Sequence, residues 1–294
     1  MPMLLHRPPP PALAPFVECL WYADGEGGPG EPRAPRERSL PTGSTTLVVR
    51  LSDHPIRIFA GLDDDTGRTF GQAVVGGARS AYYVRDTSRP IRSAGVYFRP
   101  GGASAFLGIP GDELAGRHTA LADLWGRGAV AARERLLEAG SPAAALAALG
   151  ELVLDRLPAG AALHPAVAHA LARFDASAGA APVGAVCRET GLSHRRLIEL
   201  FRRAVGLTPK VYCRIRRFQV AVARAARDRT RGWAALAQEC GFSDQAHLIR
   251  EFRAFAGIPP GRYEPVSADS PNHVPVRPDG GRSIPSKRGG APIG

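Results

Sequence analysis

Two segments near the C-terminus carry side chains that can contact the edges of DNA bases. In residues 193–204 and 243–256, polar side chains alternate with apolar ones at helical spacing. Arginine can donate to guanine, glutamine to adenine, glutamate can accept from cytosine, and isoleucine can meet a thymine methyl. The outward positions of the first segment are His194, Arg195, Ile198, Glu199 and Arg202. Those of the second are Gln245, Ala246, Ile249, Arg250 and Arg253.

Each segment follows a short helical stretch and a glycine. Gly191 and Gly241 suit the left-handed backbone of a tight turn. Ser193 caps the first segment, and Ser243 or Asp244 caps the second. The inward positions are apolar: Leu197, Leu200, Phe201 and Ala204, then Leu248, Phe252 and Phe255. This layout predicts two helix-turn-helix units, each placing its second helix in a major groove.

A long helix is predicted between the two units. Residues 209–228 begin with a proline after Thr208, which is a favourable start for a helix. Twenty residues span about 30 Å, close to the roughly 34 Å that separates successive major-groove segments on one side of DNA. One chain could therefore read two consecutive segments. The candidates for phosphate contacts are Ser193, Arg196, Arg214, Arg217 and Ser243.

The positive charge is concentrated in the part of the chain that holds these units. Residues 1–160 contain 17 basic and 17 acidic residues, whereas residues 161–265 contain 17 and 8. The net charge of +11 for the whole chain therefore comes mainly from the second half. A neutral half joined to a basic half is typical of a sensor or scaffold attached to a nucleic-acid-binding domain.

The sequence predicts an α+β protein with two domains and a tail. Residues 1–157 form a sensor or regulatory domain, a small β-barrel or sandwich with trailing helices, in which residues 16–22 are an aromatic cluster. Its strands are predicted at 45–51, 56–60, 69–75, 81–84 and 91–98, and its helices at 103–107, 121–125, 128–139 and 142–157.

The rest of the chain is predicted to be helical and then unstructured. The all-helical DNA-binding domain covers residues 163–265. Its helices are predicted at 165–176, 183–189, 193–205, 209–228, 233–239 and 243–256. Residues 266–294 contain much Pro, Gly and Ser and few large apolar residues, so a disordered tail is predicted.

Several classes of protein are disfavoured by composition. No apolar run is long enough to span a membrane, and the proline-rich N-terminus does not look like a signal peptide. The four cysteines are far apart and form no CxxC pair, so neither a disulfide framework nor a zinc site is indicated. We expect a cytoplasmic protein without catalytic residues, metal or cofactor.

Residues 164–263 resemble the DNA-binding domain of AraC/XylS-type transcription regulators. The resemblance is carried by residues 191–193 with Leu197 and Phe201, by 206–209, by 217–218, and most strongly by 241–248 with Phe252, Gly257 and Pro259. It implies two helix-turn-helix units on a long helix. By position, it places Arg195, Ile198 and Glu199, and then Gln245, Ala246, Ile249 and Arg250, against bases.

The first 157 residues resemble a less studied sensor domain found ahead of such DNA-binding domains. The matching residues are 98–103, 106–108, 112–114 and 124–126. The two resemblances together imply double-stranded promoter DNA as the partner. They leave open a small-molecule effector, contact with RNA polymerase, and a homodimer.

Two other functions are compatible with parts of the sequence. An enzyme fused to a DNA-binding domain would need clustered ligands or an activated cysteine, but His6, His54 and His118 are scattered and Cys19 lies among apolar residues. The acidic run 63–65 lies between glycines and is typical of a solvated turn. A nucleoid protein without sequence preference would need charge but no distinct reading faces.

Overall fold

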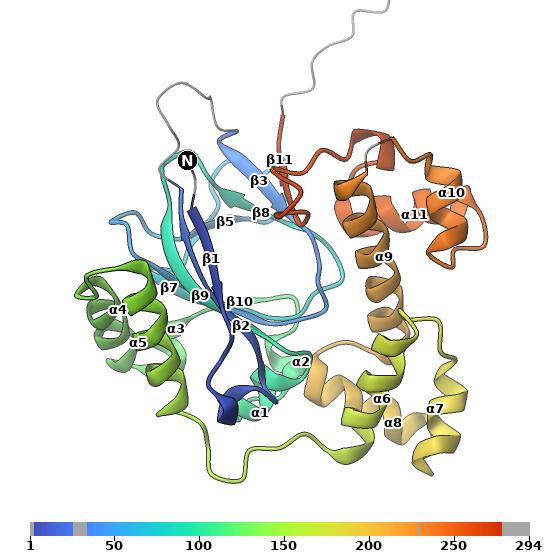
Figure 1. Cartoon of the computed structure of the whole chain (residues 1–294), viewed down its shortest axis with the longest axis horizontal. Helices are drawn as coiled ribbons and strands as arrows, with labels where there is room; N and C mark the ends of the chain where they lie inside the picture. The colour runs from blue at the N-terminus through green and yellow to red at the C-terminus, as the bar shows by residue number, and fades with distance from the viewer. Residues whose placement is uncertain (1–2, 26–33, 229, 278–294) are drawn as a thin grey trace, which may run out of the picture.

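The computed structural model describes residues 3–25, 34–228 and 230–277. The N-terminal half contains two antiparallel sheets that face one another without forming a closed barrel (Figure 1). In spatial order, sheet A consists of β1 (Met3–Arg7), β2 (Val17–Asp24), β9 (Arg92–Phe98), β4 (Thr46–Arg50), β7 (Ala73–Gly76) and β10 (His118–Ala120). Sheet B consists of β11 (His273–Pro275), β3 (Arg36–Ser39), β8 (Tyr83–Asp86), β5 (Arg57–Phe59) and β6 (Arg68–Thr69).

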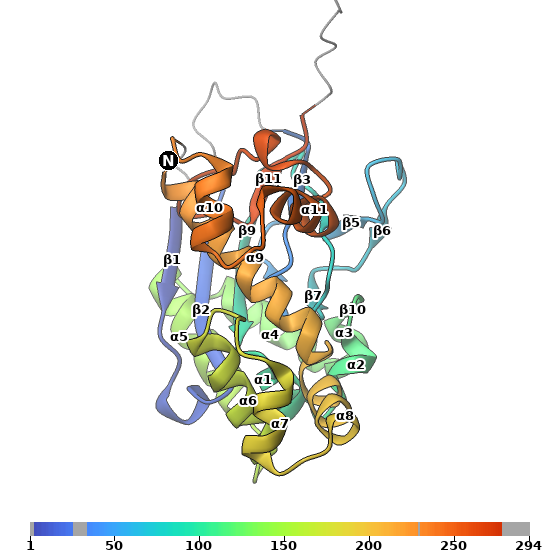
Figure 2. The ribbon, with the colours of Figure 1, turned by 90° about the vertical axis from the view of Figure 1, so that its right-hand side faces the viewer.

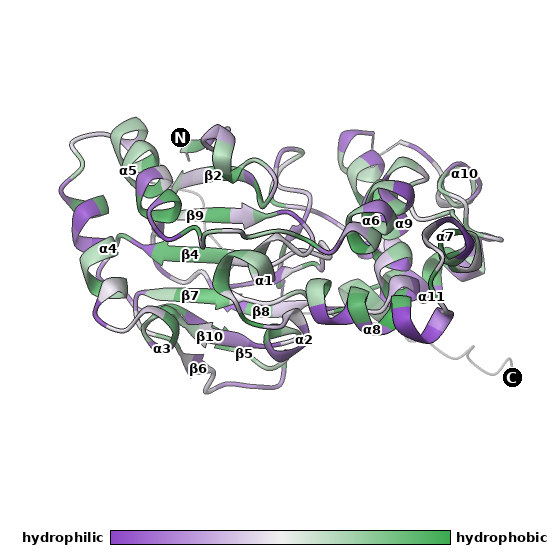
Figure 3. Cartoon of the chain, turned by 90° about the horizontal axis from the view of Figure 1, so that it is seen from below, coloured by the Kyte–Doolittle hydropathy of each residue, from purple (hydrophilic) through white to green (hydrophobic). Residues whose placement is uncertain are grey.

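Helices cover the outer face of sheet A. They are α1 (Gly102–Leu107), α3 (Leu121–Trp125), α4 (Gly128–Leu137) and α5 (Pro142–Leu154), whereas the short helix α2 (Gly111–Leu114) contributes no residue to this core. Alternate residues of the strands, such as Leu47, Val49 and Val96, pack with Phe106 and Leu149 in one apolar core. Figure 3 shows apolar colouring along β4, β7 and β9, with α3, α4 and α5 beside them. The α+β class is therefore confirmed.

The C-terminal half is helical and surrounds one long helix. Its elements are α6 (Pro165–Ala176), α7 (Val183–Thr190), α8 (His194–Val205), α9 (Pro209–Arg227), α10 (Trp233–Glu239) and α11 (Gln245–Ala256), with a 3-10 turn at Pro260–Arg262. Figures 1 and 2 show α7 and α8 at one end of α9, and α10 and α11 at the other. The aromatic rings of Phe218, Phe252 and Phe255 pack together where α9 meets α11.

The two halves are joined by a shared apolar core as well as by the chain. Leu40 and Ala78 of the N-terminal half are buried in the same cluster as the side chains of α9 and α11. The Tyr82 backbone N–H donates to the Phe255 carbonyl at 2.9 Å. The Gln219 amide on α9 donates to the Pro41 carbonyl at 2.8 Å. These contacts give the helical half a defined position against sheet B.

The prediction of a disordered tail is wrong for residues 266–277. The chain returns from the helical half, and β11 pairs antiparallel with β3 at the edge of sheet B, with Val274 buried opposite Arg38. Composition misled here because one buried valine and backbone hydrogen bonds are enough to attach an edge strand. Residues 278–294 lie outside the described residues.

The other differences concern short strands. All five predicted strand regions contain strands, although the region 69–75 is divided between β6 and β7. Four further strands were not predicted. Residues of β2 were predicted only as an aromatic cluster, and β1, β3 and β10 lie in proline- or charge-rich stretches and depend on their neighbours for pairing. Among the described residues, no helix has the combination of length and apolar content that crossing a bilayer requires.

Candidate nucleic-acid interface

The first helix-turn-helix unit has the predicted turn and cap. Gly191 ends α7 with a φ of 68°, and the Ser193 hydroxyl accepts a hydrogen bond from the Arg196 N–H at 3.3 Å. Leu197 and Phe201 of α8 are fully buried, and the Phe201 ring packs against Tyr212 of α9. The inner face of α8 therefore packs against the linker helix α9, and its opposite face is exposed to solvent.

The predicted reading residues of α8 all lie on that outer face. His194, Arg195, Glu199 and Arg202 are exposed, and Ile198 is 38% exposed, which is high for an isoleucine. Two of the group have ionic partners within the protein. Glu199 pairs with Arg196 of the same helix at 3.1 Å, and Arg202 lies 3.5 Å from Asp112 of α2.

The second unit repeats this construction with a different cap. Gly241 has a φ of 73°, and the Asp244 carboxylate accepts from the His247 N–H at 2.6 Å. This backbone hydrogen bond holds the pKa of Asp244 below its usual range. Of the two candidates, Asp244 is therefore the cap. The hydroxyl of Ser243 instead lies 3.1 Å from the Nδ1 atom of His247.

The outer face of α11 carries the predicted readers of the second unit. Four of them are exposed and Ile249 is half-buried, while Leu248 and Phe252 point into the core. The exposed four are Gln245, Ala246, Arg250 and Arg253. Each unit thus presents one helix face with hydrogen-bonding and apolar groups, as direct reading of a major groove requires.

Two predicted phosphate contacts are engaged within the protein. The guanidinium of Arg214 donates to the buried carboxylate of Glu251 on α11 at 2.8 and 2.9 Å, and lies over the Phe255 ring. Arg217 donates to the Gly241 carbonyl at 3.1 Å and lies near the Phe242 ring. Both arginines therefore hold α9 against the second unit. This role could not be predicted, because in the sequence Glu251 looks like an ordinary surface position of a helix.

The linker helix is held to the first unit in the same way. The Tyr212 hydroxyl donates to the Asp175 carboxylate of α6 at 2.7 Å, and Arg216 pairs with that carboxylate at 2.9 Å. Asp175 raises the pKa of Tyr212, although burial is the larger cause. Polar contacts therefore fix α9 to both units, which are braced apart by a helix about 28 Å long.

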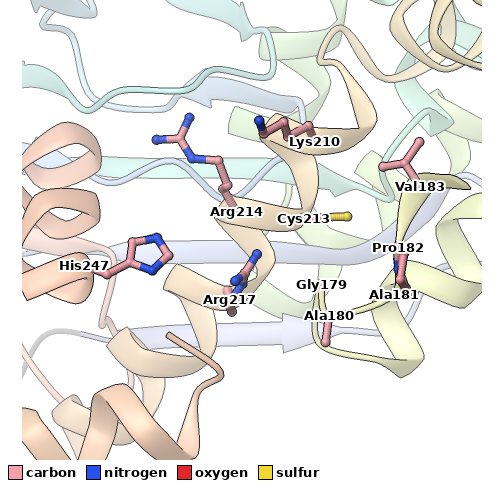
Figure 4. A pocket seen from close by; sticks show the side chains of 10 residues that line it. All are labelled: Gly179, Ala180, Ala181, Pro182, Val183, Lys210, Cys213, Arg214, Arg217 and His247. Carbon is pink, nitrogen blue, oxygen red and sulfur yellow. The ribbon is translucent and has the colours of Figure 1, made fainter. Parts of the chain in front are cut away.

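A basic groove of about 510 Å³ lies between the two units (Figure 4). Lys210, Arg214 and Arg217 line it from α9, and His247 lines it from α11. Its opposite wall is the start of α7 and the loop before it, residues 179–183. No acidic side chain is among the lining residues. Sequence reasoning missed Lys210, although it is the one lysine among residues 161–265.

Three of the four cysteines are buried, and Cys19 is half-buried. Burial, with a smaller contribution from Glu18, raises the pKa of the Cys19 thiol to about 11. Burial likewise raises the pKa of Cys213 to about 11. Both therefore remain protonated thiols at neutral pH, which is unfavourable for a nucleophile. In the described part of the chain, His, Cys, Asp and Glu side chains form no group of three or more that could hold a metal ion.

Two stretches of the chain match known family models. Residues 186–264 match a family model described as a helix-turn-helix domain, which is of the AraC type, and residues 5–120 match a domain of unknown function, DUF6597. No curated protein matches the chain.

Structures of ToxT from Vibrio cholerae are similar in overall arrangement. One, at 1.65 Å resolution, has 8% identity and a TM-score of 0.42, covering 79% of this chain and 94% of that chain. An apo ToxT variant has 8% identity and a TM-score of 0.45, covering 85% and 96%. A third, with an unsaturated fatty acid bound, has 7% identity and a TM-score of 0.43, covering 79% and 91%.

Proposed function

We propose that this chain, which belongs to the AraC-type helix-turn-helix regulators, binds specific promoter sequences and regulates transcription in response to a small molecule. Residues 163–265 are the proposed DNA-binding domain, and residues 1–157 are the proposed sensor. The observation that carries the proposal is the pair of exposed helix faces on α8 and α11, braced apart by α9 with a basic groove between them.

Each face would read a different half of the site. On α8, Arg195 would donate to a guanine, Ile198 would meet a thymine methyl, and Glu199 would accept from a cytosine once released from Arg196. On α11, Gln245 and Arg250 suit adenine and guanine. His194, Ala246, Ile249 and the outer arginines Arg202 and Arg253 would complete the two contact surfaces.

The groove would hold the DNA backbone between the two halves. Lys210 is exposed and lies on its rim, so it is the strongest candidate for a phosphate contact. Ser193, Arg196 and Ser243 lie at the starts of the reading helices, where backbone N–H groups also favour anions. Arg214 and Arg217 would contribute positive potential from the positions that Glu251 and Gly241 give them.

The remaining partners belong to the same proposal. Regulation of a promoter brings the protein near RNA polymerase, and α1 to α5 or the edge strand β1 offer surfaces for a second copy of the chain. With no group of three metal ligands in the described residues and with buried thiols, a binding function is favoured over an enzymatic one.

Selection from a random DNA pool tests the proposal. The full chain should enrich one motif with two conserved halves about one helical turn apart, because α9, the helix between the two units, is about 28 Å long. Titration of the enriched duplex against a scrambled one should then show a preference of about 10³-fold or more. Recovery of unrelated sequences with equal affinity would instead indicate a nucleoid protein.

A further inference from the structure

His247 lies beside the reading face of α11, on the flank that faces the first unit. A helix turns by about 100° per residue, so His247 projects about 60° away from Arg250, which is three residues further along. The side chain is half-buried, whereas Gln245, Ala246 and Arg250 are exposed. It lines the groove between the two units (Figure 4). His247 is therefore placed to meet a part of the DNA that lies between the two sets of bases read by α8 and α11.

Contacts with two preceding residues hold the His247 ring in place. The ring packs edge-on against the buried ring of Phe242, with centroids 5.4 Å apart and 84° between the planes. The Ser243 backbone N–H donates to the Nδ1 atom of His247 at 3.3 Å. The Ser243 hydroxyl lies 3.1 Å from the same nitrogen. The imidazole therefore has a fixed orientation before any ligand binds, which lowers the entropic cost of a contact.

The hydrogen bond to Nδ1 decides which nitrogen of the ring carries the proton. A ring nitrogen that accepts a hydrogen bond has no hydrogen of its own, so the proton of the neutral imidazole lies on Nε2. Within the described residues, the hydrogen bonds of His247 involve its backbone N–H and its Nδ1 atom, and none involves Nε2. The side chain therefore presents a spare N–H donor at the wall of the groove.

The groove around this donor is positively charged. Lys210, Arg214 and Arg217 line it from α9, and none of the lining residues is acidic. In Figure 4 the His247 ring points from α11 towards these side chains of α9. Both arginines donate to acceptors within the protein, so their guanidinium groups keep their positions beside the groove. A neutral donor among fixed cations, with no acidic group on the wall, suits an anion that carries several oxygen atoms.

We propose that His247 donates from Nε2 to one backbone phosphate of the DNA strand that crosses the groove, beside the contact of Lys210. This inference rests on the proposed function and adds a residue to its DNA contacts. His247 belongs to the second unit, whereas the opposite wall of the groove, residues 179–183, leads into the first. The phosphate would therefore lie between the two halves of the site, and the contact would favour every DNA sequence alike.

The same geometry makes Ser243 a positioning residue for His247. Its backbone N–H donates to the imidazole, and its hydroxyl lies between that ring and the Asp244 carboxylate, 3.3 Å from the latter. Ser243 thus acts on the phosphate through the orientation of the ring. Ser243→Ala keeps the backbone N–H and should weaken DNA binding less than removal of the imidazole does.

Titration of the full chain with the selected duplex and with a scrambled duplex tests the contact. Two variants separate the ring nitrogens, because the amide nitrogen of glutamine reaches the position of Nε2 and that of asparagine only the position of Nδ1. His247→Gln should bind both duplexes within about threefold of the wild type, since the donor is kept. His247→Asn should bind both about tenfold or more weakly, the size of one hydrogen bond to a charged group. His6→Asn, the same change at an exposed position of β1, is the matched control and should bind like the wild type.

Methylphosphonate substitutions in the selected duplex locate the phosphate. Each substitution replaces one charged oxygen by a methyl group, and the positions are tested one at a time. One substitution between the two conserved halves should weaken binding of the wild type and hardly change that of His247→Asn, because the variant has already lost the contact. A purely structural role of His247 would instead give the same cost at every phosphate in both proteins, with a lower unfolding temperature for His247→Asn without DNA.

Three results would overturn the proposal: unchanged binding by His247→Asn, an equal loss in His247→Gln, or a loss confined to the selected duplex, which would make His247 a reader of bases. Buffers of equal ionic strength with phosphate or chloride should give the same affinity, and weaker binding in phosphate would indicate a site for the free anion instead. The contact is also measured on the scrambled duplex. Equal binding of both duplexes by the wild type would therefore refute sequence-specific regulation without deciding the role of His247, which the variants decide separately.

Discussion

At the scale of single residues, the structure divides the arginines of the helical half into two groups. Arg195 and Arg250 are exposed at the outer faces of α8 and α11. Arg214, Arg216 and Arg217 hold the helices together through Glu251, Asp175 and the Gly241 carbonyl. Charge alone could not separate these groups in the sequence, because the carboxylates that engage the second group come from distant parts of the chain.

The exposed arginines, Arg195 and Arg250, should determine which DNA sequence is preferred. Arg250→Ala is expected to weaken binding to the selected site by about 1–3 kcal/mol and to relax preference at one base pair. Lys210→Ala is the comparison, since it should weaken binding to all sequences alike. It should also reduce the slope of log affinity against log salt concentration by about one, because one phosphate contact is lost. Titrations of cognate and scrambled duplexes at several salt concentrations measure both effects. An equal loss on both duplexes for Arg250→Ala would show that this arginine contacts only phosphate.

Glu189 should make the contact between α6 and α7 sensitive to acid. Hydrogen bonds from Arg173, then His169, lower the pKa of this exposed carboxylate to about 2 from the ordinary 4.5. A depressed pKa in the folded state gives stability that is present above the unfolded pKa and is lost as the pH falls from about 4.5 toward 2.

Chemical unfolding at pH 6 and pH 3 of the wild type and of Glu189→Gln would measure this contribution. The wild type should lose more stability over this interval than Glu189→Gln, which cannot titrate. Parallel losses in the two proteins would contradict the assignment.

At the scale of elements, the helices could be predicted from the sequence far better than the strands. Helix periodicity, Thr208 before Pro209, and glycines at helix ends are local signals, and α6 and α10 begin and end at the predicted residues. The strands β1, β3 and β11 lie at sheet edges or in charged stretches, and they form because a partner strand is already present. No local sequence pattern indicates that such a partner strand is present.

The strand β11 should stabilise the whole chain. A protein ending at residue 265 loses β11, the burial of Val274, and the hydrogen bond from the Tyr263 hydroxyl to the Pro271 carbonyl. We expect it to be less stable by about 2–4 kcal/mol, from one buried valine and one or two hydrogen bonds. A protein ending at residue 277 retains the strand and is the control. Equal urea midpoints for the two truncated proteins would show that β11 contributes nothing.

At the scale of the whole molecule, the N-terminal half touches one of the proposed reading helices. Gly111 of α2 lies so near the end of α8 that a Cβ there would be 2.6 Å from the Ala204 carbonyl oxygen and 2.7 Å from the Gly206 nitrogen. The Asp112 carboxylate next to it lies 3.5 Å from Arg202. The position of α8 therefore depends on the N-terminal half, which neither motif analysis nor composition could indicate.

Gly111→Val should force this contact open. The added side chain would collide with backbone atoms, which cannot turn aside as a flexible side chain can. We expect a larger radius of gyration in small-angle scattering, together with tighter DNA binding because Arg202 is released from Asp112. Gly140→Val, where nothing lies within 4 Å of the added Cβ, is the control. Unchanged scattering for Gly111→Val would mean that the halves adjust without separating.

The return of β11 to sheet B also has a consequence for how the protein is made. A ribosome delivers β3, β5, β6 and β8 first, but their sheet lacks its edge strand β11 until the whole helical half has emerged. The half that is synthesised first is thus the half that is completed last. Nascent chains halted before residue 273 would hold a helical half with all its helices beside an N-terminal half whose sheet B still lacks an edge strand.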